Sequence, residues 1–129
     1  MEISNSKGRW SVNEGDLILI KCIYGGKPRP VQRTLGRFEG TMQEPMKRGG
    51  PTRDYLILGA PHHSLNIIEV DGISFPTITP SETENTRAID FITEIYIGRE
   101  DIAERLPQIH PAYASYVPFI KQLAESIKG

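Results

Sequence analysis

The sequence has little of what marks secreted, membrane or disordered proteins. It contains one cysteine, Cys22, so an internal disulfide and a multi-cysteine zinc site are excluded and a reducing compartment is expected. No apolar run approaches the roughly 20 residues of a membrane-spanning helix, and the first residues lack the basic start and apolar core of a signal peptide. Charged residues at 24% and apolar residues at 38% exclude collagen-like and strongly charged disordered chains. We therefore expect one globular domain over residues 1–129, in the cytoplasm and without membrane contact.

Charge is balanced over the whole chain but not along it. The formal net charge of the 129 residues is −1. Residues 21–53 carry eight basic residues against two acids, a balance of +6, whereas residues 69–129 carry five basic residues against ten acids, a balance of −5. This asymmetry indicates either an anionic partner for the basic part or a fold in which the two parts face each other.

Apolar alternation predicts five to six short strands between about residues 15 and 97. The strongest prediction is the segment 16–24 (DLILIKCIY), whose apolar residues occupy both faces of an extended chain. Residues 87–97 (RAIDFITEIYI) fit a partial helical stripe as well, but strict alternation and frequent β-branching favour a strand there. The remaining predicted strands are 31–39, 54–59, 64–70 and 73–79.

Turn residues divide these strands. Asp71-Gly72 predicts a two-residue hairpin of the type-I′ kind, and Pro76 places the strand that follows at the edge of a sheet. Gly36 suggests a bulge or a strong bend within the strand 31–39. Residues 40–53 show no apolar period and two turn signals, which predicts a long, mobile, basic loop.

Two helices are expected at the C-terminal end. The first covers residues 99–109 and is expected to stop near Pro107. The second carries an apolar stripe over 111–128, and because Pro118 falls in its first turns, it either starts nearer Tyr116 or kinks there.

This order of elements predicts an α+β fold. A small, strongly bent β-sheet or barrel of five to six strands (about 15–97) is followed by two C-terminal helices. We expect a β-rich part over residues 10–97 and a helical part over 99–128. Small barrels host many unrelated functions, so the architecture by itself selects none.

The basic stretch is the best candidate for a binding site. Guanidinium and ammonium groups on a pleated face suit phosphate oxygens, and aromatic rings beside them stack on bases. The alternative is a solvated face that pairs with the acidic C-terminal part of the same chain. The candidate nucleic-acid-binding residues are Lys27, Arg29, Arg33 and Arg37 on or beside the strand 31–39, Lys47, Arg48 and Arg53 in the following loop, and the aromatic residues Tyr24, Phe38 and Tyr55.

The histidines offer a weaker catalytic hypothesis. The stretch His62-His63-Ser64-Leu65 resembles one copy of the His-x-Ser/Thr-hydrophobic motif of two-histidine phosphoesterases. That family uses two copies, and the segment at His110 has Ala112 where the second hydroxyl residue should be. Adjacent histidines point in different directions on an extended chain, so we predict no metal site and no cofactor.

These observations rank three functions. The first is a non-enzymatic small β-barrel module that binds an anionic partner, RNA or DNA above all, through residues 27–53. The second is a structural or interaction protein that forms a homo-oligomer, its basic part docking on the acidic part of a neighbouring copy. The third is a small phosphate-handling enzyme that uses His62 and His63.

Overall fold

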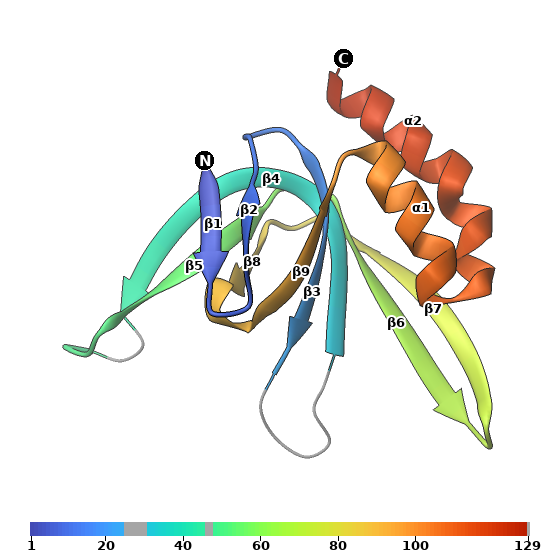
Figure 1. Ribbon diagram of the computed structural model, residues 1–129, viewed down its shortest axis with the longest axis horizontal. Coiled ribbons are helices and arrows are strands. Elements are labelled where there is room, and N and C mark those ends of the chain that lie inside the picture. Colours follow the sequence, from blue (N-terminus) through green and yellow to red (C-terminus); the bar gives the residue numbers. More distant parts are fainter. Residues whose placement is uncertain (25–30, 46–47, 129) are drawn as a thin grey trace.

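The protein is built around one strongly bent antiparallel sheet with two helices against one face (Figure 1). The computed structural model of the protein describes residues 1–24, 31–45 and 48–128. The strands are β1 (Glu2–Asn5), β2 (Gly8–Ser11), β3 (Leu17–Ile23), β4 (Val31–Pro45), β5 (Thr52–Leu58), β6 (His62–Val70), β7 (Ile73–Ser81), β8 (Asn85–Ala88) and β9 (Ile92–Ile97). The helices are α1 (Arg99–Ile109) and α2 (Val117–Lys128), with 3-10 turns at Ile89–Phe91 and Pro111–Tyr116.

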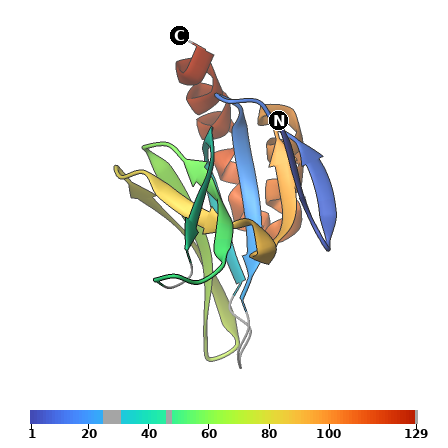
Figure 2. The same ribbon diagram turned by 90° about the vertical axis from the view of Figure 1, so that its left-hand side faces the viewer.

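Five strands follow one another in the order β7-β6-β4-β3-β9 and curl into a half-barrel. β4 is long and bent: its first half pairs with β3 and β6, and its second half pairs with β5, which in turn pairs with β8. β1 and β2 form a separate hairpin beside the half-barrel (Figure 2). The predicted α+β class, with a curled sheet followed by two helices, is confirmed.

Two hydrophobic clusters hold the layers together, one on each face of β3. Ile18 and Ile20 face the inside of the half-barrel, whereas Leu17 and Leu19 face the helices. Burial on both faces explains why the sequence of this strand is apolar at nearly every position. The buried residues inside the half-barrel are Ile3, Val12, Ile18, Ile20, Cys22, Phe38, Leu56, Leu58, Ile89, Ile92 and Ile95. Those between sheet and helices are Leu17, Leu19, Leu35, Leu65, Ile102, Leu106, Tyr113 and Ile120.

The hairpin between β6 and β7 forms as its sequence predicts. Asp71 and Gly72 have φ angles of 51° and 78°, the left-handed pair that a type-I′ turn requires. Among the strands of the described ranges, β7 pairs only with β6, so Pro76 does lie on an edge strand. The missing N–H of proline leaves no gap in a ladder at such an edge.

Much of the segment 40–53, which the sequence predicts as a loop, is strand at its two ends. β4 continues to Pro45 and pairs with β5 from Thr52 onward, in a register that matches Pro45 with Thr52. Most side chains in this part of β4 are exposed, so the ladder needs no apolar alternation. The bend in β4 also differs from the prediction at Gly36: the register shifts between Phe38 and Gly40, where Gly40 has a φ of 124°.

The predicted strand 87–97 is two strands separated by a turn. β8 ends at Ala88, the 3-10 turn Ile89–Phe91 follows, and β9 begins at Ile92. The chain turns a corner here because β8 pairs with β5 whereas β9 pairs with β3. Alternation alone does not reveal this change of neighbour.

Each helix contains one proline: Pro107 lies near the end of α1, and Pro118 lies near the start of α2. The predicted helix 99–109 is confirmed: α1 covers Arg99–Ile109 and ends two residues after Pro107, near the expected position. Pro107 has no N–H to donate to the carbonyl of Ala103, so α1 lacks one hydrogen bond close to its C-terminal end. α2 starts at Val117, which puts Pro118 in its first turn, where its missing N–H costs nothing.

Candidate anion-binding site

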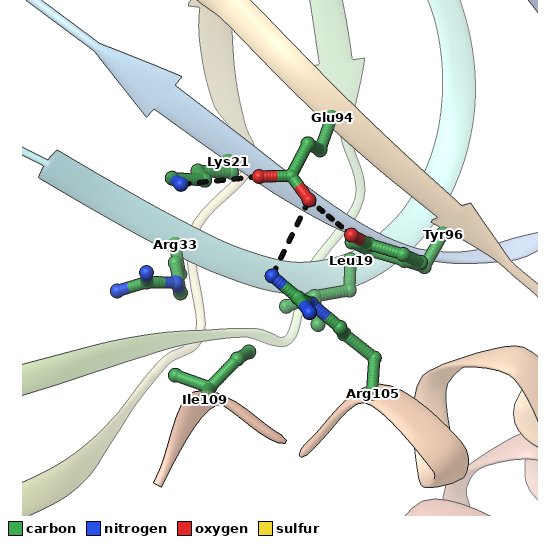
Figure 3. A pocket seen from close by; sticks show the side chains of 7 residues that line it. All are labelled: Leu19, Lys21, Arg33, Glu94, Tyr96, Arg105 and Ile109. Atoms are coloured by element: carbon green, nitrogen blue, oxygen red, sulfur yellow. Dashed lines mark hydrogen bonds and ion pairs between the residues drawn. The ribbon is translucent and has the colours of Figure 1, made fainter. Parts of the chain in front are cut away.

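Three basic side chains and one carboxylate line a small cavity on the face of the sheet that α1 covers (Figure 3). We call Lys21, Arg33, Glu94, Tyr96 and Arg105 the basic cluster. They line a small cavity of about 10 Å³ together with Leu19 of β3 and Ile109 of α1. A space of this size accepts about one water-sized group, so it suits one oxygen of a larger ligand.

Strand register brings the cluster together. On β3, Lys21 lies opposite Arg33 of β4 on one side and opposite Glu94 of β9 on the other. Directly paired residues share a face, so all three project toward α1. Arg105 belongs to α1. The next residue, Leu106, is buried against the sheet.

Glu94 is the centre of the hydrogen-bonding pattern. Its Oε2 lies 3.1 Å from Nζ of Lys21, and its Oε1 lies 3.5 Å from Nη2 of Arg105. Tyr96 donates its hydroxyl to the same Oε1. The guanidinium of Arg105 also lies over the ring of Tyr96, 5.3 Å from the ring centroid.

These contacts set the ionisation of the two acidic groups. Partial burial opposes the charge on Glu94, but hydrogen bonds from Tyr96 and Lys21 and the nearby cations outweigh it and lower the pKa of Glu94. Burial first, and then the hydrogen bond to Glu94, raise the pKa of Tyr96. The contacts therefore favour the charged form of Glu94 and the neutral form of Tyr96.

Among the described residues, Arg33 is the basic side chain of the cluster that has no acidic partner. Within the described residues no carboxylate lies within 4.0 Å of its guanidinium, and Figure 3 shows no interaction from it to the rest of the cluster. Residues 25–30, 46–47 and 129 contain no aspartate or glutamate in their sequence. Like charges directly opposite on neighbouring strands, as at Lys21 and Arg33, destabilise a sheet. An anion bound between them removes that repulsion.

The other arginines of the predicted site do not join the basic cluster. Arg37 shares the face of Arg33, as predicted, but it pairs with Glu39 at 2.5 Å. Arg53 lies 3.9 Å from Asp90, and its guanidinium lies over the ring of Phe91. Arg48 is exposed in the turn after β4. Lys27, Arg29 and Lys47 lie outside the described residues.

The three aromatic residues that were predicted to stack on bases differ in their exposure. Phe38 is fully buried inside the half-barrel, so the predicted stacking role of its ring is wrong for this structure. Tyr24 is half-buried against Phe91, with 5.0 Å between ring centroids, and its hydroxyl donates to Gln32. Tyr55 is half-buried on β5. Phe75, which the sequence reading did not select, is exposed on β7.

The charge asymmetry of the sequence is partly resolved inside the fold. Lys21 pairs with Glu94 and Arg53 pairs with Asp90, so two basic residues of 21–53 contact acids of the C-terminal part. The alternative that the two parts face each other is therefore correct for these residues. It does not account for Arg33 or for the exposed Arg48.

The histidines serve packing in this structure. His62 donates from Nδ1 to the carbonyl of Thr83 at 2.7 Å, and the His63 ring packs edge-on against Phe119 of α2 at 5.1 Å between centroids. Both side chains are buried, and burial lowers the pKa of His63. In the described ranges, no three His, Cys, Asp or Glu side chains are grouped as a metal ion would need.

Comparisons with known proteins add no assignment. No protein-family model, no curated protein and no solved structure matches this chain. Among the helices of the described residues, none is both long enough and apolar enough to cross a lipid bilayer.

Proposed function

We propose that the protein is a binding module for an anionic polymer, RNA or DNA above all, which it contacts through the basic cluster and the basic segment 27–53. The observation that carries this proposal is the surplus of cations at Lys21, Arg33 and Arg105 around the single carboxylate of Glu94. A phosphate oxygen placed at Arg33 supplies the negative partner that this side chain lacks among the described residues.

The shape of the site favours a polymer over a small molecule. The cavity of the cluster is too small to enclose a whole phosphate, and Arg33 and Arg105 are only partly buried. Arg48 adds an exposed positive charge on the turn after β4, away from the cluster. A backbone with repeated phosphates contacts such separated charges one phosphate at a time.

We expect binding to a single-stranded oligonucleotide to weaken steeply with salt, because each neutralised phosphate releases a counterion. Replacing Arg33 and Arg48 together by glutamine removes two contacts. The slope of log affinity against log salt should then fall by about 1.4, at about 0.7 for each contact to a single strand. Fluorescence anisotropy at several salt concentrations measures this change.

The matched control changes the same net charge elsewhere. Arg9 and Arg99 are exposed arginines outside the basic segment, and their double replacement by glutamine should leave the slope unchanged. Absence of binding by the parent chain at low salt, or an equal loss in the control variant, contradicts the proposal.

A specific observation supports the homo-oligomer as a second candidate. Ile68, Val70, Ile73 and Phe75 are each exposed over half or more of their surface. The register matches Ile68 with Phe75 and Val70 with Ile73, so all four lie on one face of the β6–β7 hairpin. A contiguous apolar face on a protruding edge hairpin is typical of contacts between proteins.

If this face joins two copies, the wild-type chain should show twice its monomer mass by light scattering. Phe75→Glu should then return it to the monomer mass, because it places a charge in an apolar interface. Thr41→Glu adds the same charge at an exposed position of β4 and should leave the dimer intact. A monomeric wild-type chain at all concentrations removes this candidate.

A further inference from the structure

An arginine is buried inside the half-barrel, and no carboxylate of the described residues pairs with it. Arg87 of β8 is 7% exposed. The register places it opposite Leu56, which is fully buried, so both side chains project toward the interior. A buried arginine is expensive because the desolvated charge requires compensation.

The hydrogen bonds of Arg87 satisfy only part of its guanidinium. Nη1 donates to the backbone carbonyl of Thr86 at 2.9 Å, and Nη2 donates to Oγ1 of Thr34 at 3.2 Å. Both acceptors are neutral. Nε is buried and has no partner within the described residues. A guanidinium has five N–H donors arranged to bind two oxygens of one anion side by side.

No aspartate or glutamate among the described residues serves as the missing partner. All aspartates and glutamates of the chain belong to the described residues, and none lies within 4.0 Å of the Arg87 guanidinium. The stretches outside the described residues contain none in their sequence. The compensating charge therefore does not come from a side-chain carboxylate of this chain.

The face of β4 that Arg87 contacts through Thr34 carries further polar groups. Cys22 lies opposite Gln32 in the register, and Thr34 follows on the same face of β4. The hydroxyl of Tyr24 donates to Gln32 at 3.0 Å. Burial raises the pKa of the Cys22 thiol and of Tyr24, while the charge of Arg87 acts against it at both groups.

We infer that Arg87 binds an oxyanion, a phosphate group by its chemistry, through Nε and the adjacent N–H of its guanidinium. Within the described residues β8 has one strand neighbour, β5, so its other edge has no strand partner. The site is separate from the basic cluster, because Thr34 and Arg33 are consecutive on β4 and point to opposite faces. It stands whether or not the cluster binds nucleic acid.

The test is thermal unfolding of the full chain in rising inorganic phosphate, with chloride keeping the ionic strength constant. A ligand that binds the folded state raises Tm progressively with its concentration. We expect this rise for the wild type and for Arg9→Met, which removes an exposed arginine outside both sites, and a smaller rise for Arg87→Met. A second series with adenosine monophosphate separates the two sources of the group. A larger shift than with inorganic phosphate identifies a nucleotide, and an equal shift identifies free phosphate.

A direct measurement covers the case in which Arg87→Met does not fold. In the ¹⁵N-labelled wild-type chain, the Nε–H resonance of Arg87, assigned with Arg87→Lys, should move saturably as phosphate is added. The inference is overturned if phosphate changes neither Tm nor this resonance relative to chloride. It is also overturned if Arg33→Met abolishes the response while an Arg87 variant retains it, since the anion then sits at the basic cluster.

Discussion

Replacing Phe38 by alanine is expected to lower the free energy of unfolding by about 3–5 kcal/mol. Phe38 is 0% exposed and packs inside the half-barrel with residues from β3, β5 and β9. It also lies beside the register shift at which β4 bends from one set of neighbours to the other. Truncation removes the ring contacts and leaves a cavity that strands anchored on several sides cannot close.

Phe75 provides the matched control, because it is the same residue type at 50% exposure on β7. Phe75→Ala should change the free energy of unfolding by about 0.5 kcal/mol or less, as surface substitutions do. Urea denaturation of the wild type, Phe38→Ala and Phe75→Ala measures the three free energies of unfolding, which are comparable when the m-values of the three transitions agree. A loss from Phe38→Ala as small as that from Phe75→Ala would contradict the position of this ring in the core.

Replacing Ile120 by alanine should cost about 2–5 kcal/mol. Ile120 of α2 is 1% exposed and packs with Leu106 and Tyr113 against the helix-side face of the sheet. The hydroxyl of Tyr113 extends this packing to β6 and β7, since it donates to the carbonyls of Asn66 and Thr77. Loss of Ile120 therefore weakens the contact between the helices and the half-barrel.

The control for this substitution is Ile68→Ala, which removes the same atoms from a side chain that is 52% exposed. We expect a change of about 0.5 kcal/mol or less for it. Denaturant titration of both variants gives the comparison. If Ile120→Ala costs no more than Ile68→Ala, α2 is not packed on the sheet in solution, and a role as an arm for a partner becomes the better explanation.

Much of the fold could be predicted because local residues determine it. Alternation on β3 and the Asp71-Gly72 turn depend on neighbours along the chain, and both were recognised. The hairpin that joins β4 to β5 was missed because its exposed strands need no apolar period. The short hairpin of β1 and β2 was missed for the same reason, although Val12 is buried as an anchor after it.

The candidate site was only partly predictable, because its residues meet through strand pairing. Arg33 was selected from the basic run, but Glu94 and Arg105 join it only through the register of β9 and the packing of α1. Phe38 shows the converse error. Its face of β4 also carries Gln32 and Thr34, and those polar neighbours concealed that the curvature of the sheet turns this face into the interior.

The pairing of β3 with β9 also governs when the half-barrel can form. Ile18 of β3 pairs with Ile97 of β9, so two neighbouring strands are separated by most of the chain. During synthesis β3 leaves the ribosome long before its partner, and one of its edges stays open until residue 97 is available. Contacts between residues so distant in sequence slow folding, because the loop must close before they stabilise it. The apolar strand is thus exposed to aggregation during translation for longer than the finished sheet suggests.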